Sequence, residues 1–222
     1  MIILTTISPT NIDNQQQAVN SWLKLGHTVY SLNSKNDIEQ IKSNFDIEFV
    51  EVENLGTTEF KKDYVRLNAF TDWIKENGSA LIINSDIEIY GDVEIKDEPK
   101  TIQVFSRNDY AVNINNSIKF NSGFDAFYLT KEFCMWIPKS RLVIGQCHWD
   151  YYLPLMAIKH GFILKSPDKS NMYHKKHKLQ YDGGKWKQTA RIFAIELGLT
   201  GNAHYDSQNA HKEIKSKIQN YQ

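Results

Sequence analysis

Strand and helix patterns alternate through the first 90 residues of this chain. Apolar runs typical of strands occur at 2–7, 28–32, 47–52 and 81–83, and helical spacing of apolar residues occurs at 14–25, 37–45 and 58–77. Such alternation favours right-handed strand–helix–strand units and a parallel sheet with helices on its faces. The pattern therefore predicts an α/β fold.

The second half of the chain has a different pattern. Strands are expected at 101–106, 125–129 and 162–165, and helices at 149–159 and 187–197. There is no internal repeat and no low-complexity linker, and 222 residues suffice for one α/β domain with a sizeable core. We expect a single Rossmann-like domain with a mostly parallel central sheet, flanking helices and a mixed second half.

Composition limits where such a protein works. No apolar run approaches the roughly 20 residues that span a bilayer, so no transmembrane segment is expected. The first residues lack a basic region and resemble a strand more than a signal peptide. Cys134 and Cys147 give neither a disulfide framework nor a metal-binding spacing, so a cytoplasmic protein with reduced thiols is expected.

Two acids follow the apolar run at 81–83. Asp86 and Glu88 are separated by Ile87, and residues two apart in an extended strand point to the same side. Carboxylate oxygens at the carboxyl end of a buried strand suit a hard cation and a phosphate ligand. A solvated strand end is the alternative interpretation of the same pair.

Charge is unevenly distributed, although the formal net charge is zero. Residues 159–222 hold 12 Lys or Arg against 5 acids, together with five of the seven histidines. A basic segment beside an acidic site suits a ligand with phosphates, such as a nucleotide diphosphate. A solvated basic surface explains the charge equally well.

Several motifs in the order found here resemble nucleotide-sugar glycosyltransferases of the GT-A fold. The resemblance is strongest to the family-8-like group that includes glycogenin and bacterial lipopolysaccharide galactosyltransferases, and it covers roughly residues 1–180. It rests on Tyr64-Val65-Arg66-Leu67, the run from Leu81 to Glu88, Phe120-Asn121-Ser122-Gly123-Phe124, Trp149-Asp150, and a late histidine, His174 or His177.

The resemblance implies a division of labour along the chain. It makes residues 1–90 a nucleotide-binding half, 91–180 a donor-sugar and acceptor half, and 181–222 a helical, basic segment. The implied activity moves a sugar from a nucleotide-diphosphate sugar, most commonly a UDP-sugar, to an acceptor. The acceptor remains open among a glycan, a protein, a small molecule and a nucleic acid.

A divalent cation is part of this expectation. Asp86, Glu88 and His174 are the expected ligands, with His177 as the alternative histidine. Mn²⁺ is the first choice and Mg²⁺ the second, because carboxylates with one imidazole suit Mn²⁺. The cation would stabilise negative charge on the leaving diphosphate.

Other residues receive roles on the same basis. Asp150 is expected at the reacting sugar, as a general base in an inverting enzyme or a stabilising carboxylate in a retaining one; a helix N-terminal acid is the alternative. Asn121 is placed with it as a catalytic residue. Donor-binding roles are assigned to Thr5, Thr6, Ser8, Arg66, Ser85, Asp86, Ser122, Gly123 and Lys176, with Lys175 and Lys178 as further diphosphate contacts.

The chain departs from the family pattern in three respects. Glu88 stands where the family has a second Asp, and the family's Asp-Gln-Asp pattern is absent, with Gln146-Cys147-His148-Trp149-Asp150 in its region. The family's His-x-x-Gly-x-x-Lys-Pro-Trp ending is distorted, with Asp182-Gly183-Gly184-Lys185-Trp186 after His177. Two further functions therefore stay open. One is a catalytically silent nucleotide-sugar or glycan-binding module, and the other is a nucleotidyltransferase.

Overall fold

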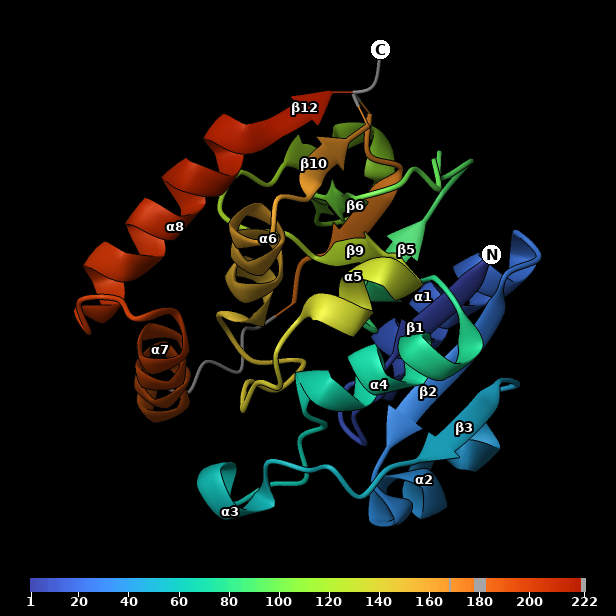
Figure 1. Ribbon diagram of the computed structural model, residues 1–222. Helices are drawn as coiled ribbons and strands as arrows, with labels where there is room; N and C mark the ends of the chain where they lie inside the picture. Colours follow the sequence, from blue (N-terminus) through green and yellow to red (C-terminus); the bar gives the residue numbers. More distant parts are fainter. Residues whose placement is uncertain (168, 178–182, 221–222) are drawn as a thin grey trace.

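A central sheet runs through the computed structural model, which describes residues 1–167, 169–177 and 183–220 (Figure 1). Within these residues the sheet has eight strands, in the order β12 (Ile218–Asn220), β10 (Ile163–Ser166), β6 (Thr101–Phe105), β9 (Ala126–Leu129), β4 (Ala80–Ile83), β1 (Ile2–Thr5), β2 (Thr28–Asn33) and β3 (Glu48–Glu51). β9 is antiparallel to β4 and β6, and the other pairings are parallel. The predicted α/β class with a mainly parallel sheet is confirmed.

A second, smaller sheet accompanies the first. Its strands follow the order β5 (Ile87–Ile89), β11 (Met172–Lys175), β7 (Asn108–Tyr110) and β8 (Ile118–Lys119). β11 is antiparallel to β5 and parallel to β7, so segments from three distant parts of the sequence meet in this sheet. These short strands account for the mixed character of the second half.

Helices cover both faces of the central sheet (Figure 1). The described α-helices are α1 (Ile12–Lys24), α2 (Lys35–Ile41), α3 (Thr57–Phe60), α4 (Leu67–Asn77), α5 (Lys131–Trp136), α6 (Trp149–Lys159), α7 (Gly183–Leu197) and α8 (Ala203–Lys217). Two short 3-10 helices lie at Lys42–Asn44 and Ile114–Asn116.

β4 shows how the core is divided between the two faces. Ala80 and Ile82 belong to a cluster with residues of α4, α5, α6 and α8, whereas Leu81 and Ile83 belong to a cluster with residues of α1, α2 and β5. Successive residues of a strand point to opposite faces, and both faces of the sheet are covered here, so all four side chains are fully buried. The apolar run at 81–83 is therefore a strand covered on both sides, as its composition predicts.

The helix expected over 58–77 is broken into α3 and α4. Lys61 adopts a left-handed conformation with φ of 55°, and the amide of Gly56 donates to the Tyr64 carbonyl at 2.8 Å. A bridge between Leu55 and Val65 completes this loop. Its backbone bonds across the loop instead of along a helix, so the single-helix prediction is wrong for residues 61–66.

The strand expected to carry both Asp86 and Glu88 is also interrupted. β4 ends at Ile83, and the amide of Ile87 donates to the Asn84 carbonyl at 3.2 Å across a turn. β5 then starts in the second sheet. The two acids do not share one side of a continuous strand, and that prediction is wrong.

The C-terminal part is helical, as expected for 181–222, over the described stretches α7 and α8. β12 then adds a strand that pairs with β10 at the edge of the central sheet, which its polar sequence does not predict. Among the described residues, no helix combines the length and apolarity needed to cross a membrane.

Candidate metal centre and ligand cleft

A cleft of about 640 Å³ opens at the carboxyl ends of β1, β4 and β6. The sheet order reverses at β1, because β2 and β3 lie on one side of it and β4 on the other. Crevices at such a reversal are where α/β sheets bind ligands. The loops after these strands, the loop before β9 and the start of α6 supply many of the lining residues, and the segments at 62–65, 144–148 and 174–177 supply others.

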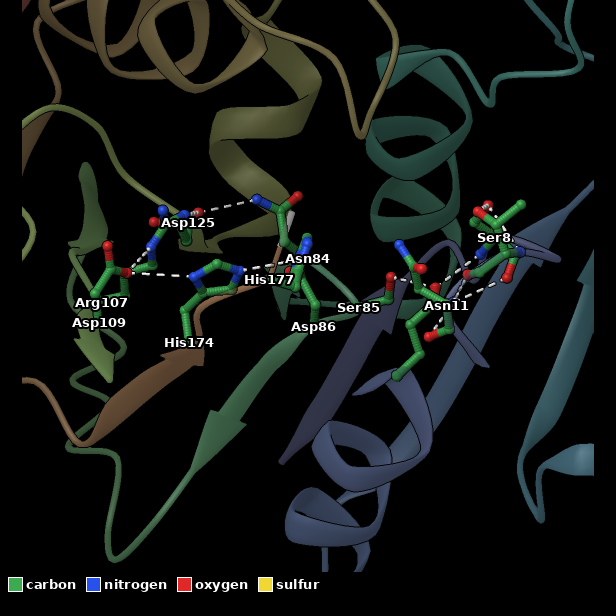
Figure 2. Close-up of polar contacts among 12 residues, drawn as sticks. Ser8, Asn11, Asn84, Ser85, Asp86, Arg107, Asp109, Asp125, His174 and His177 are labelled. Carbon is green, nitrogen blue, oxygen red and sulfur yellow. Dashed lines mark hydrogen bonds and ion pairs between the residues drawn. The ribbon is translucent and has the colours of Figure 1, made fainter. Parts of the chain in front are cut away.

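Three side chains on one wall of the cleft bring their ligand atoms together (Figure 2). The Asp86 Oδ2 atom lies 3.4 Å from His174 Nε2 and 3.3 Å from His177 Nε2, and the two Nε2 atoms are 3.2 Å apart. Neighbouring ligands held about 2.0–2.2 Å from one ion are separated by about 3.0–3.4 Å. The triangle formed by Asp86, His174 and His177 therefore fits a single metal ion.

The second sheet brings these residues together. β11 carries His174, and its pairing places this residue opposite Ile87 of β5 and Asp109 of β7. Ile87 directly follows Asp86, while His177 lies two residues beyond the end of β11. The site thus depends on a strand pairing between residues almost 90 positions apart.

Electrostatics favour the ionised form of Asp86. Burial opposes ionisation, but hydrogen bonds and charge interactions with His174 and His177 hold the pKa of its carboxyl far below the usual range. The Asp86 carboxylate is thus available as a metal ligand.

Glu88 lies outside this cluster. Its side chain is buried, with 3% exposed, and accepts hydrogen bonds from the hydroxyls of Tyr90 and Tyr110. The bond from Tyr90 to Glu88 raises the pKa of that tyrosine to about 12. Glu88 is therefore not part of the group that could hold a metal ion, because the turn at 84–87 separates the two acids, whereas His177 is part of it.

Asp150 is the second residue of α6 and lines the same cleft. Its Oδ1 accepts from the amide of His148 at 3.1 Å. Burial, with a contribution from the charge of Asp125, raises the pKa of Asp150 to about 7. A carboxyl with this pKa can accept or donate a proton near neutral pH.

Gly123 packs directly against this acid. A Cβ atom at this position would lie 3.2 Å from Asp150 Oδ2 and 3.3 Å from a ring carbon of Phe120. Glycine therefore leaves the Asp150 carboxyl room beside the loop. Ser122 and Gly123 line the cleft, but Asn121 does not; its carbonyl accepts from Lys215 Nζ at 2.9 Å beside a smaller pocket.

A hydrogen-bond network around Gln15 lines another part of the cleft. Gln15 Oε1 accepts from the Ser8 amide at 2.8 Å and from the Ser85 hydroxyl at 2.7 Å. Its Nε2 donates to the carbonyls of Ser8 and Thr10 at 2.9 and 2.7 Å. This buried amide fixes the loop after β1 to the turn that carries Asp86.

The remaining predicted residues fall into two groups. Thr6, Ser8 and Ser85 line the cleft, whereas Thr5 is buried and donates to the Ile83 carbonyl at 2.8 Å.

Arg66 is also turned toward the protein, where it pairs with Glu59 at 2.6 Å and donates to the carbonyls of Leu55 and Arg141. Lys176 is exposed and not among the cleft-lining residues, and Lys178 lies outside the described residues.

Five residues that define the site were not predicted from the sequence: Gln15, Arg107, Asp109, Asp125 and His148. Asp125 lines the cleft and is 4% exposed, and its Oδ2 has no hydrogen-bond partner among the described residues. A polar residue within an apolar helical stripe was an available signal for Gln15. For Asp109 no local pattern exists, since its role depends on the pairing of β7 with β11.

Comparison with known proteins adds no evidence to the geometry of the site. The chain matches no family model and no curated protein.

Proposed function

We propose that this protein is a metal-dependent glycosyltransferase that uses a nucleotide-diphosphate sugar. The observation that carries the proposal is the triangle formed by Asp86, His174 and His177 in a cleft that also contains Asp150. A metal ion and an acid–base group in one cleft are the two components that transfer from a diphosphate leaving group requires. A GT-A-type domain is part of this proposal.

The charges around the Asp86–His174–His177 triangle suit a divalent ion. Three acids lie here, Asp86 beside the two histidines and Asp109 and Asp125 paired with Arg107, so the group carries an excess of negative charge when the histidines are neutral. A bound divalent ion would offset this charge and act as a Lewis acid toward the diphosphate.

The ligand set refines the choice of metal. Two imidazoles and one carboxylate suit Mn²⁺, Fe²⁺ or Zn²⁺ better than Mg²⁺, which prefers oxygen ligands. Mn²⁺ remains our first choice, and Mg²⁺ is less favoured than the sequence alone suggests.

The other cleft residues can be given roles that agree with their positions. The loop at 8–11 leads into the first turn of α1, where free amides favour an anionic ligand. Asp150 would act on the acceptor hydroxyl in an inverting reaction or stabilise the sugar in a retaining one. The acceptor can be a glycan, a protein, a small molecule or a nucleic acid.

A hydrolase acting on the same class of ligand is the second candidate. Three protein ligands leave positions for water on the ion, as in catalytic zinc sites. Release of free sugar in the absence of any acceptor, with no increase when acceptors are added, would favour hydrolysis. Donor binding without turnover would instead favour a silent binding module.

The substitution Asp86→Asn tests the proposal. We expect UDP with Mn²⁺ to raise the melting temperature of the wild type, and a panel of nucleotide sugars to identify a donor that releases nucleotide. Asp86→Asn should lower metal-stimulated donor cleavage and transfer at least about 100-fold, since it removes the sole carboxylate of the triangle.

Asp46→Asn provides the control, because Asp46 is an exposed acid outside the cleft. Full activity of Asp86→Asn would contradict the metal assignment. A wild type that responds to no nucleotide, with or without metal, would contradict the donor assignment.

A further inference from the structure

A chain of charged side chains lies behind His174 (Figure 2). Asp109 Oδ1 is 3.3 Å from His174 Nδ1 and accepts from Arg107 Nε at 2.7 Å. Arg107 Nη1 donates to Asp125 Oδ1 at 2.6 Å, and the same oxygen accepts from the Asn84 side chain at 3.1 Å. Because Asn84 is two residues before Asp86, this chain connects both elements that carry the metal ligands.

Asp109 favours Nδ1 as the protonated nitrogen of His174, because an ionised carboxylate can only accept hydrogen bonds. In the metal-free protein Asp86 Oδ2, 3.4 Å from Nε2, competes for the proton. A metal ion held by Asp86, His174 and His177 would need the Nε2 lone pair, so the tautomer that Asp109 favours is the one that can bind the ion. Metal-binding histidines are commonly oriented in this way by a carboxylate on the other ring nitrogen.

Arg107 holds Asp109 in the position that this contact requires. Its guanidinium bonds two carboxylates whose side chains are 17% and 6% exposed, and it lies 4.1 Å from the centre of the Phe120 ring. The planar guanidinium offers separate donors to the two acids and stacks on the ring, which an ammonium group cannot do. Arg107 thus connects Asp109, which contacts His174, to the loop at 120–125.

We propose that Arg107 and Asp109 are positioning residues for the metal centre, holding His174 as the Nδ1–H tautomer with Nε2 directed at the ion. The inference rests on the metal site of the proposed function. It extends that function, because part of the metal affinity would depend on Asp109 and Arg107, which act through His174 and are not themselves metal ligands.

Asp109→Ala and Asp109→Asn test the proposal by two measurements on the full chain. Mn²⁺ affinity, determined from free Mn²⁺ by electron paramagnetic resonance, should fall about 10- to 100-fold in Asp109→Ala and less in Asp109→Asn, which keeps an acceptor. Long-range ¹⁵N NMR of metal-free Asp86→Ala at about pH 9, which lacks the competing carboxylate at Nε2, should show Nδ1–H on His174, and Nε2–H when Asp109→Ala is added.

Arg107→Lys is the second variant, because it keeps the charge that the two acids need. It should also weaken Mn²⁺ binding, by a smaller factor than Asp109→Ala. Glu98→Gln removes an ion pair with Lys165 outside the cleft and should leave both measurements unchanged.

The two proposals fail in different ways. Unchanged Mn²⁺ affinity in Asp109→Ala, or an Nε2–H tautomer in metal-free Asp86→Ala, would overturn the positioning role while the metal function stands. A wild type that binds no Mn²⁺, together with an Asp109-dependent tautomer in Asp86→Ala, would overturn the metal function and support the orienting contact.

Discussion

At the scale of a single residue, Asp150 lowers the stability of the folded protein and is at the same time suited to carry a proton. Its burial, together with the charge of Asp125, makes the ionised form costly and raises its pKa to about 7. The same environment makes it a proton carrier near neutral pH. Ionised Asp150 therefore lowers the free energy of unfolding, at the residue that we expect to transfer the proton.

Asp150→Asn should be more stable and less active than the wild type. The folded pKa lies above the unfolded value of 3.8, so ionisation costs stability as pH rises from about 4 to about 7. Urea unfolding at pH 8 should show a gain of about 1–2 kcal/mol, after allowance for partial exposure. The gain should disappear below about pH 4, while transfer should fall about 10²- to 10⁴-fold. A less stable Asp150→Asn at pH 8 would contradict this account.

At the scale of elements, the start of α6 is held by helices from the end of the chain. His148 precedes α6 with φ of 79°, and its ring lies 3.0 Å from the Thr189 hydroxyl of α7 and 3.1 Å from the Ser207 hydroxyl of α8. Trp186 and Phe193 pack on the same ring. The orientation of Asp150 thus depends on α7 and α8.

Mild acid should weaken this junction. Burial lowers the pKa of His148 to about 4, below the unfolded value of 6.5, so the stability that neutral His148 contributes is lost as pH falls from about 6.5 to 4. The loss should reach about 2 kcal/mol at pH 5. His148→Asn, which tolerates the left-handed backbone, should show a smaller difference in urea unfolding between pH 7 and pH 5. Equal pH dependence in both proteins would exclude His148 as the cause.

At the scale of the whole molecule, the C-terminal segment completes the core of the second half. Ile214 of α8 is fully buried in the cluster that also contains residues of α4, α5 and α6. β12 then extends the central sheet beyond β10. This arrangement supports one cooperative unit that includes α8.

Ile214→Ala tests whether α8 unfolds together with the rest of the domain. Truncating a buried isoleucine should lower the free energy of unfolding by about 2–5 kcal/mol, because it leaves a cavity in the shared core. Tryptophan fluorescence and far-ultraviolet circular dichroism should still report one coincident transition. Lys212→Ala, an exposed change on the same helix, should be within about 0.5 kcal/mol of the wild type. Separate transitions by the two probes would indicate that α8 unfolds independently.

Elements whose residues interact with near neighbours can be predicted from the sequence alone. Alternating apolar patterns predicted the parallel half of the sheet, the buried strand β4, and α6 with its first residue, because burial on known faces leaves a periodic trace. Asp86, His174 and Asp150 were chosen as candidate site residues from their places next to these elements and from the family resemblance, and their roles stay predictions.

Contacts between distant residues follow only from the tertiary structure. Glu88 lies outside the group formed by Asp86, His174 and His177 because a two-residue turn ends β4, and no pattern in the sequence records where a strand leaves one sheet for another. Arg107, Asp109 and Gln15 join the candidate site through pairings and hydrogen bonds that span up to 70 residues. Such contacts are set by packing of the whole chain, which is why the sequence pattern predicts acids and histidines for a metal site but not which of them lie together.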